Sequence, residues 1–130
     1  MLAKRNIVSL LAPHPPRTNL NIFRVDDSYA VRVARITGEY PWHQHDTFDE
    51  GWVVLDGSVR MRTDDGDLEL GSLEAVLIPA GLRHSPLALE DGSTVMIINA
   101  KGFTTNYSYG DSDESAGYVE FDVEDAEAQR

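Results

Sequence analysis

Residues 43–57 read HQHDTFDEGWVVLDG, and the fold prediction starts from this stretch. Two histidines, His43 and His45, stand two positions apart, ahead of Glu50 and a run of strand-forming residues that ends at Gly57. In an extended chain, residues i and i+2 point to the same face, so both imidazoles can reach one object. Imidazole and carboxylate are ligands that divalent transition metals prefer. The stretch therefore predicts half of a metal site beside a β-strand.

Residues 79–84 read PAGLRH and supply a third histidine. Pro79 ends an apolar run at a point where its missing N–H does little harm. Gly81 permits the positive φ angle that a sharp turn needs, and His84 then opens the next predicted strand. Three histidines and one carboxylate, with one or two positions left for water or substrate, make a coherent ligand set for a divalent metal.

Asp49 is an alternative to Glu50 as the carboxylate of this set. Glu50 is preferred because only it lies seven residues before Gly57. Position 50 is out of phase with His43 and His45, so an irregularity or bulge is required between residues 46 and 49. Outside these segments the sequence has one further histidine, His14, in a proline-rich stretch without a nearby partner. We interpret it as an exposed loop residue.

The region between residues 20 and 100 alternates short strand patterns with turn signals. No stretch in it shows helical periodicity over ten or more residues. The apolar run at 75–78 is typical of a buried strand, and Asp65-Gly66 is a strong hairpin signal. These patterns predict a β-barrel or β-sandwich. Strands are expected at 20–25, 29–37, 50–56, 59–63, 68–70, 75–78, 84–89 and 94–100.

The chain has 130 residues, which suits one domain. We divide it into an N-terminal arm (1–19), a β domain (20–105) and an acidic C-terminal tail (106–130). Residues 1–12 could form a short helix or an edge strand. The tail carries −7 of the net charge of −11. It could add an edge strand to this chain or to a partner, or it could be solvated and frayed.

Composition excludes several classes of function. The net charge of −11 argues against nucleic acid or an anionic membrane as a partner, because both need clustered Lys and Arg. The absence of cysteine excludes disulfides and thiolate metal ligands. No apolar run approaches the roughly 20 residues of a membrane helix, so a cytoplasmic location is expected. Phosphate-binding loops, dinucleotide fingerprints, serine elbows and HExxH zinc motifs are also missing.

The two histidine segments resemble the two motifs of the cupin superfamily. The first motif reads roughly G-x5-H-x-H-x(3,4)-E-x6-G, and the second reads roughly G-x5-P-x-G-x-x-H-x3-N. The matching residues are His43, His45, Glu50 and Gly57 in the first motif, and Pro79, Gly81 and His84 in the second. Three positions depart from the patterns. Gly38 lies one residue too close to His43, Leu73 stands where a glycine is expected, and Ala88 replaces the asparagine.

The resemblance spans about residues 30–100 and implies an all-β fold, a double-stranded antiparallel jelly-roll β-barrel. It is to small single-domain bacterial cupins. It implies that His43, His45, Glu50 and His84 hold one divalent transition metal per chain, with Fe, Mn, Ni, Co or Zn as candidates. Since metal binding competes with protons, metal loss is expected near pH 6 and below as the histidines protonate.

Three functions remain open at this point. The first is a metal-dependent enzyme (a dioxygenase, isomerase or lyase) acting on a small oxygenated metabolite. The second is a non-catalytic or regulatory module that binds a small ligand or metal. The third is a structural barrel that acts only through dimerisation. The sequence identifies no catalytic acid or base beyond the ligands. A homodimer is expected, formed through barrel faces, the apolar residues of 7–11 or the tail strand.

Other side chains near the predicted site have competing interpretations. Trp52 shares the parity of Glu50, so it forms either a pocket wall or plain core. Trp42 is out of phase with His43 and is expected to pack outside or at a dimer contact. For Arg83, next to His84, an ordinary surface charge is favoured over contact with an acidic substrate. A solvated face is likewise favoured for Arg60 and Arg62.

Overall fold

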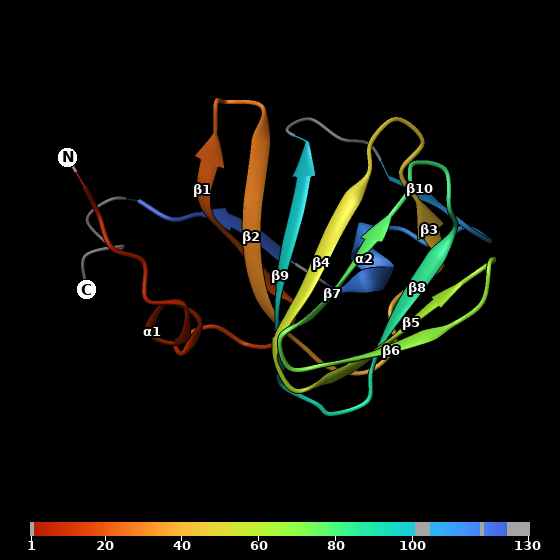
Figure 1. The fold of residues 1–130 in the computed structure, drawn as a ribbon, viewed down its shortest axis with the longest axis horizontal. Helices are drawn as coiled ribbons and strands as arrows, with labels where there is room; N and C mark the ends of the chain where they lie inside the picture. The colour runs from red at the N-terminus through yellow and green to blue at the C-terminus, as the bar shows by residue number, and fades with distance from the viewer. Residues whose placement is uncertain (1, 101–104, 118, 125–130) are drawn as a thin grey trace.

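The computed structural model describes residues 2–100, 105–117 and 119–124, and most of its regular structure is β-strand (Figure 1). Two short helices accompany the strands: α1 (Ile7–Leu11) and α2 (Asp113–Ala116). The strands are β1 (Thr18–Val25), β2 (Tyr29–Ile36), β3 (His43–Gln44), β4 (Glu50–Asp56), β5 (Ser58–Thr63), β6 (Leu68–Gly71), β7 (Glu74–Ile78), β8 (His84–Ala88), β9 (Ser93–Ala100), β10 (Asn106–Tyr107) and β11 (Val119–Asp122).

The strands form two sheets that lie against each other in Figure 1. The six-stranded sheet has the order β11-β1-β2-β9-β4-β7, and the five-stranded sheet has the order β10-β3-β8-β5-β6. Neighbouring strands are antiparallel, except that β11 pairs parallel with β1. The mostly-β prediction is confirmed. The closed, wholly antiparallel barrel is not, because the sheets of the described residues do not join and one pair is parallel.

The main hydrophobic core lies between the two sheets. Strand alternation explains it, because every second residue of β2, β4 and β9 points toward the other sheet. Val54, Val59, Met61 and Val95 are completely buried there. Burial of such side chains contributes roughly 1.5–3 kcal/mol each. This core holds the two sheets at a fixed separation. It thereby positions the side chains that the two sheets direct toward each other at the site described below.

A second, smaller core lies on the outer face of the six-stranded sheet. Helix α1 packs its Leu11 against Leu20 and Ile22 of β1 and Val31 and Val33 of β2. Asn6 caps the helix, since its side chain accepts a hydrogen bond from the Ser9 backbone N–H. The alternatives of helix and edge strand for residues 1–12 are therefore resolved in favour of a helix.

Neither of the two described helices covers the outer face of the same sheet over β9, β4 and β7. Leu77 is 62% exposed and Ile98 is 37% exposed, and both pair with Gly51 of β4, which lies between them. The prediction that residues 75–78 form a buried strand is wrong in the single chain. β7 is the edge strand of its sheet, and only Ile78 at its end is buried. Its continuous apolar sequence therefore faces the core on one side only.

Two turns show why particular residues stand there. Gly57 has φ of 111°, and a Cβ at this position would lie 2.2 Å from Ser93 Oγ. Only glycine fits such a close approach. Leu73 has φ of 65° although it is not glycine. It is the position where the cupin motif expects glycine, and left-handed backbone costs an L-residue about 1–2 kcal/mol.

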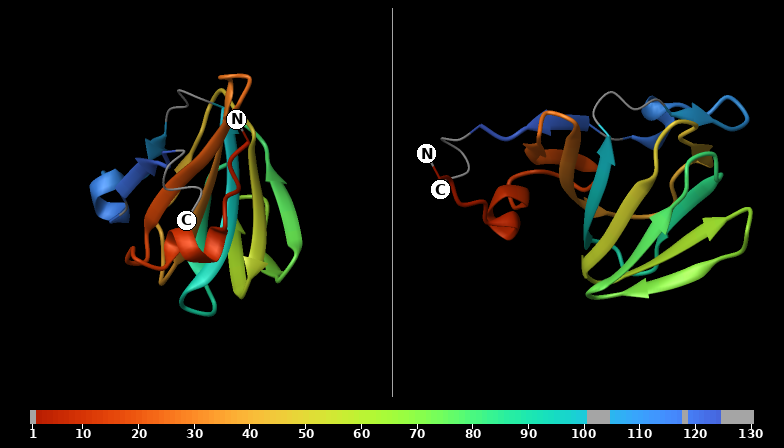
Figure 2. Two further views of the ribbon diagram at one scale, coloured as in Figure 1. Left: turned by 90° about the vertical axis from the view of Figure 1, so that its left-hand side faces the viewer. Right: turned by 45° about the horizontal axis from the view of Figure 1, so that its top comes forward.

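The C-terminal segment returns to the β sandwich and is fastened to it. Its strand β10 pairs with β3, and β11 extends the six-stranded sheet beyond β1 (Figure 2). Arg17 holds α2 from the other side, because its guanidinium donates hydrogen bonds to the carbonyl oxygens of Ala116 and, at 3.0 Å, of Thr37. The segment thereby forms part of the wall of the site below. No helix of the described residues is long and apolar enough to cross a membrane.

Candidate metal centre

The predicted ligands come together between the two sheets. His43 on β3 pairs directly with His84 on β8, so their side chains share one face of the five-stranded sheet. His45 follows His43 by two residues and points the same way, while Glu50 opens β4 on the opposite sheet. Ligand atoms of the three histidines lie within 4.8 Å of one another. Four side chains that are distant in sequence thus converge on one point.

Glu50 makes the closest contacts within this group. Its Oε2 lies 2.9 Å from His45 Nε2, and its Oε1 lies 3.5 Å from His84 Nε2. His45, Glu50 and His84 are all buried, with His84 at 0% exposure. The required irregularity between residues 46 and 49 is confirmed, and it is a loop that carries the chain from the five-stranded sheet to the six-stranded sheet.

Backbone carbonyls orient two of the imidazole rings. His43 Nδ1 lies 2.8 Å from the Pro41 carbonyl oxygen, and His84 Nδ1 lies 2.9 Å from the Leu82 carbonyl oxygen. A carbonyl can only accept, so each Nδ1 carries the proton and donates it. In a neutral ring the Nε2 lone pair is then available, which is the arrangement that metal-binding histidines commonly show. His45 Nδ1 has the Thr105 hydroxyl at 3.3 Å.

Two neighbours hold the Glu50 carboxylate in place. The Trp52 indole N–H donates to Oε1 at 2.5 Å, and the Asn99 amide donates to Oε2 at 2.5 Å. Burial by itself raises the pKa of this carboxyl group, but the adjacent His45 and His84 rings outweigh that effect and hold the pKa well below its usual value. Glu50 is therefore a carboxylate at neutral pH, as a metal ligand must be.

His43 is kept neutral by its surroundings. Burial lowers its pKa to about 4, and the nearby His84 ring acts in the same direction. A neutral imidazole is the form that binds metal. The pH at which protons compete for His43 is consequently lower than the value near 6 expected from an ordinary histidine.

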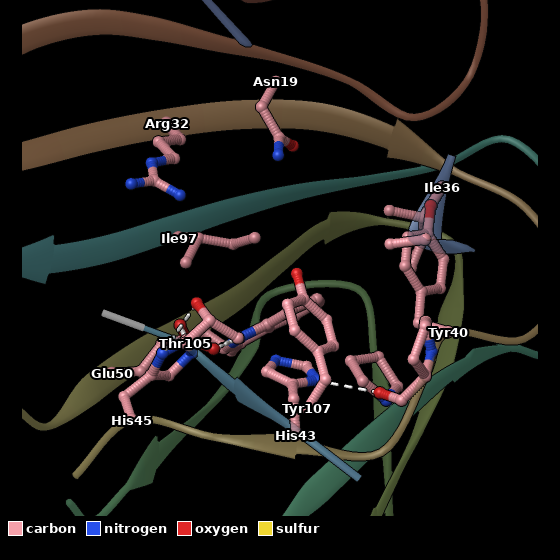
Figure 3. A pocket seen from close by; sticks show the side chains of 14 residues that line it. Asn19, Arg32, Ile36, Tyr40, His43, His45, Glu50, Ile97, Thr105 and Tyr107 are labelled. Carbon is pink, nitrogen blue, oxygen red and sulfur yellow. Dashed lines mark hydrogen bonds and ion pairs between the residues drawn. The ribbon is translucent and has the colours of Figure 1, made fainter. Parts of the chain in front are cut away.

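A cavity adjoins the cluster. It has about 70 Å³ of space for the centres of water-sized atoms, several times the volume that one water needs. Figure 3 shows His43, His45 and Glu50 on one side of it. The lining residues are Asn19, Arg32, Ile36, Tyr40, Pro41, His43, His45, Glu50, Trp52, Pro86, Ile97, Thr105, Tyr107 and Ala116. A mostly apolar wall with a few convergent polar groups is typical of a small-molecule site.

The alternatives near the site are decided by position. Asp49 is exposed and accepts a hydrogen bond from the Ala80 backbone N–H at 3.0 Å, so it is not the carboxylate of the cluster. His14 lies apart, with its ring 5.7 Å from that of Phe121. Trp52 is both buried and part of the cavity wall.

The surface predictions hold for Arg60 and Arg83 but not for Arg62. The Arg62 side chain is 19% exposed, pairs with Glu39 at 2.9 Å and donates to the Ser85 carbonyl oxygen at 3.2 Å. Arg83 forms an ion pair with Asp64 at 3.0 Å and lies over the Trp42 ring, 4.9 Å from its centroid. Arg60 pairs with Glu69 at 2.6 Å on the outside. These arginines are not among the residues that line the cavity.

Sequence reasoning missed the groups that come from outside the two motifs. Asn99 belongs to β9, Arg32 to β2, and Thr105 and Tyr107 to the C-terminal segment. Tyr107 stands beside His43 because β10 pairs with β3. The pairing of strands far apart in sequence gave no local signal. For Arg32 a signal existed, since an arginine alternates there with alanine and isoleucine on the inward face.

The donor set fits a divalent transition metal. Three imidazoles and a carboxylate suit Zn, Fe, Mn, Co and Ni alike. The buried Nε2 atom of His84 meets no hydrogen-bond partner of good geometry among the described residues. Buried polar nitrogens are rarely left in this state, and a metal bond satisfies them.

Comparison with known families matches this geometry. The sequence profile described as Cupin domain matches residues 31–100, a span that contains all four clustered residues. The chain belongs to the cupin family. This cupin is also 39% identical, over 67 residues, to the uncharacterised protein YdbB of Bacillus subtilis (strain 168). That match covers 51% of the chain and 58% of the relative's length.

Solved structures show the same fold. A cupin-2 domain containing protein from Shewanella frigidimarina has a TM-score of 0.64 and 28% identity, covering 68% of this cupin and 84% of that chain. A sugar phosphate isomerase of the cupin superfamily from Silicibacter pomeroyi has a TM-score of 0.56 and 23% identity, and the match covers 65% of this cupin and 59% of that chain. The hydroquinone 1,2-dioxygenase PnpCD, in complex with Cd²⁺ and 4-hydroxybenzonitrile, has a TM-score of 0.64 and 21% identity, and the match covers 75% of this cupin and 72% of that chain.

Proposed function

We propose that this cupin binds one divalent transition metal through His43, His45, His84 and Glu50. The observation that carries the proposal is the convergence of three imidazoles and a carboxylate on one buried point. The carbonyl partners of His43 and His84 support it, because they leave the Nε2 atoms of these rings as electron-pair donors.

We further propose that the cavity beside the metal binds a small oxygenated molecule. A divalent ion there supplies Lewis acidity to an oxygen atom of the ligand. Tyr107 and Thr105 form a polar wall near His43 and His45, and Trp52, Ile97 and Ile36 form an apolar one. This mixture orients a ligand that carries both kinds of surface. Fe, Mn, Ni, Co and Zn all remain candidates for the metal.

Turnover by a dioxygenase, isomerase or lyase reaction is the first form of the proposal, and binding without turnover is the second. Solved structures with the same fold include a dioxygenase and an isomerase, but their sequence identities to this chain are low and support the shared fold alone. The cavity next to the ligand set favours a site open to a small molecule over a closed structural metal site. The homodimer and the cytoplasmic location stay predictions.

Metal analysis after purification without an affinity tag tests the proposal. The wild type should retain about one equivalent of metal per chain, and His45→Ala should retain less than about a tenth of it. His14→Ala is the matched control, since it removes a histidine outside the cluster. Circular dichroism should show the same strand content in all three proteins. Equal metal content in all three proteins would contradict the proposal.

A further inference from the structure

We propose that this cavity selects an anionic ligand, a small oxygenated carboxylate, and that Arg32 binds its carboxylate group. The inference rests on the proposed metal function, because the metal would hold the other end of the ligand. It adds the chemical class of the ligand and a residue that determines specificity. The two cupin motifs do not contain Arg32.

Arg32 lies in the cavity wall away from the three histidines and Glu50. It belongs to β2, on the inward face of the six-stranded sheet, and is only 6% exposed. In Figure 3 it lies with Asn19 on one side of the cavity, with His43, His45 and Glu50 on the other and Ile97 between. A ligand in the cavity would therefore meet the metal at one end and a guanidinium at the other.

The charge of the wall favours an anion. Among the described lining residues, Arg32 is the one lysine or arginine and Glu50 is the one carboxylate. Glu50 would offset half of the charge of a divalent ion, so the metal end is positive by one unit and Arg32 adds a second. Charge-assisted hydrogen bonds between a guanidinium and a carboxylate are among the stronger polar contacts, and a carboxylate ligand would form them with Arg32 from inside the cavity. The surrounding low dielectric strengthens that attraction.

A carboxylate fits better than a phosphate. One planar guanidinium matches a carboxylate with two parallel hydrogen bonds. A phosphate dianion usually gathers several cationic or backbone N–H donors, as at helix N-termini or glycine-rich loops. Among the described lining residues, Arg32 is the one lysine or arginine, and the uncharged donors include the Asn19 amide and the Thr105 and Tyr107 hydroxyls. The space of about 70 Å³ for atom centres also limits the ligand to a small acid.

The acidic tail places a competitor next to this arginine. Glu120 on β11 has its Oε1 3.4 Å from Arg32 Nε, and the Asn21 amide donates to the same carboxylate oxygen at 2.9 Å. The Glu120 side chain is 40% exposed, whereas that of Arg32 is 8% exposed. The glutamate thus stands at the rim and offsets part of the arginine charge. Its removal should strengthen the binding of an anion inside.

Calorimetric titration of the metal-loaded full chain tests the proposal. The probes are glycolate, 3-hydroxypropionate and 4-hydroxybutyrate, each paired with its neutral amide, together with inorganic phosphate. At least one carboxylate should bind ten or more times more tightly than its amide, and phosphate should bind more weakly than that carboxylate. Arg32→Gln should abolish the preference for carboxylate over amide, and Arg32→Lys should retain part of it.

Glu120→Gln is a second test, in which carboxylate binding should become stronger rather than weaker. The Glu120 side chain is half-exposed, so its substitution leaves the core intact. It should strengthen carboxylate binding two- to fivefold at low salt, and less at high salt, because salt screens the charge removed. It should leave amide binding unchanged. Glu114→Gln, at an exposed acid of α2, is the matched control and should change neither.

Metal content is measured first, so the two proposals fail in different ways. A chain that takes up no metal overturns the metal function and this inference with it. A metal-loaded chain that binds carboxylate and amide equally, or binds neither, overturns this inference alone. A preference for phosphate overturns the choice of carboxylate. An unchanged carboxylate affinity in Glu120→Gln contradicts the role of Arg32 even if Arg32→Gln fails to fold.

Discussion

Glu50 illustrates how single residues create this site. Its carboxylate is buried, yet it accepts hydrogen bonds from Trp52 and Asn99 and faces His45 and His84. A carboxylate without such partners would be too costly to bury. Asn99 is thus a positioning residue for Glu50, placed by β9 on the strand next to β4.

Asn99→Ala should lower the metal affinity by about 10- to 100-fold, because the carboxylate loses a donor that fixes its orientation. Competition with a chromophoric chelator measures the affinity. Asp49→Asn is the control, since Asp49 neighbours Glu50 in sequence but points to the surface and its amide retains an oxygen that can accept from Ala80. An Asn99→Ala protein with wild-type affinity would show that Trp52 alone suffices.

The lowered pKa of His43 predicts a pH-dependent stability of the metal-free protein. The folded-state pKa is about 4 and the ordinary value is 6.5, so the unfolded chain takes up the proton first as the pH falls. Stability is therefore fully present above about pH 6.5 and declines toward pH 4, by up to about 3 kcal/mol. Glu50 acts in the same direction, but only below its ordinary pKa of 4.5.

Urea unfolding at pH 7, 6 and 5, with a chelator present, measures this decline. His43→Gln should remove most of the slope between pH 6.5 and 5, whereas His14→Gln, at the histidine outside the cluster, should retain it. A free energy of unfolding that is the same at pH 7 and pH 5 in the wild type would be inconsistent with a neutral, buried His43.

At the scale of elements, short strands and tight turns position the ligands. β3 has only two residues, yet its pairing with β8 on one side and β10 on the other aligns His84, His43 and Tyr107 across the sheet. The turn before β7 carries Leu73 with φ of 65°. Its side chain is 81% exposed, so packing repays little of the backbone strain.

Leu73→Gly should stabilise the protein by about 0.5–1 kcal/mol. Glycine removes the cost of the left-handed conformation, and part of that gain is lost to its greater freedom in the unfolded chain. Thermal unfolding should show a Tm higher by about 2–5 °C. Leu73→Ala removes the same exposed side chain but keeps a Cβ, so it should change the Tm little. If both variants change the Tm by the same amount, backbone strain at Leu73 does not explain the change in stability.

At the scale of the whole molecule, the two faces of the six-stranded sheet differ. The inner face carries the core and the site, and α1 covers one half of the outer face. The other half, over β9, β4 and β7, presents exposed Leu77 and Ile98. Exposed apolar patches of this kind commonly mark association surfaces. The expected homodimer would cover this face.

Leu77→Glu should convert a homodimer to a monomer, as measured by light scattering after size-exclusion chromatography. The net charge of −11 on each chain opposes association, so added salt should strengthen the wild-type dimer. Leu89→Glu is the control, because Leu89 is 41% exposed but follows β8 in the other sheet. A wild type that is monomeric at all salt concentrations would contradict the dimer prediction.

Much of the fold and the centre of the site could be predicted from the sequence. The strand at 50–56 is predicted to the residue, because its run of strand-forming residues and the turn at Gly57 are local signals. The prediction of a buried strand at 75–78 is wrong, because a continuous apolar pattern does not distinguish a strand covered on both faces from an edge strand covered on one. The parallel pairing of β11 with β1 also lay beyond local pattern.

The sequence by itself determined which residues are candidate ligands of the proposed metal. The spacing of His43, His45, Glu50 and His84 depends on strand parity and on turns that Gly57 and Gly81 permit, and these are local properties of the chain. The tertiary structure alone decided what surrounds them. Asn99, Tyr107 and Arg32 reach the site only because distant strands pair, and the pKa of His43 falls mainly because those strands bury it.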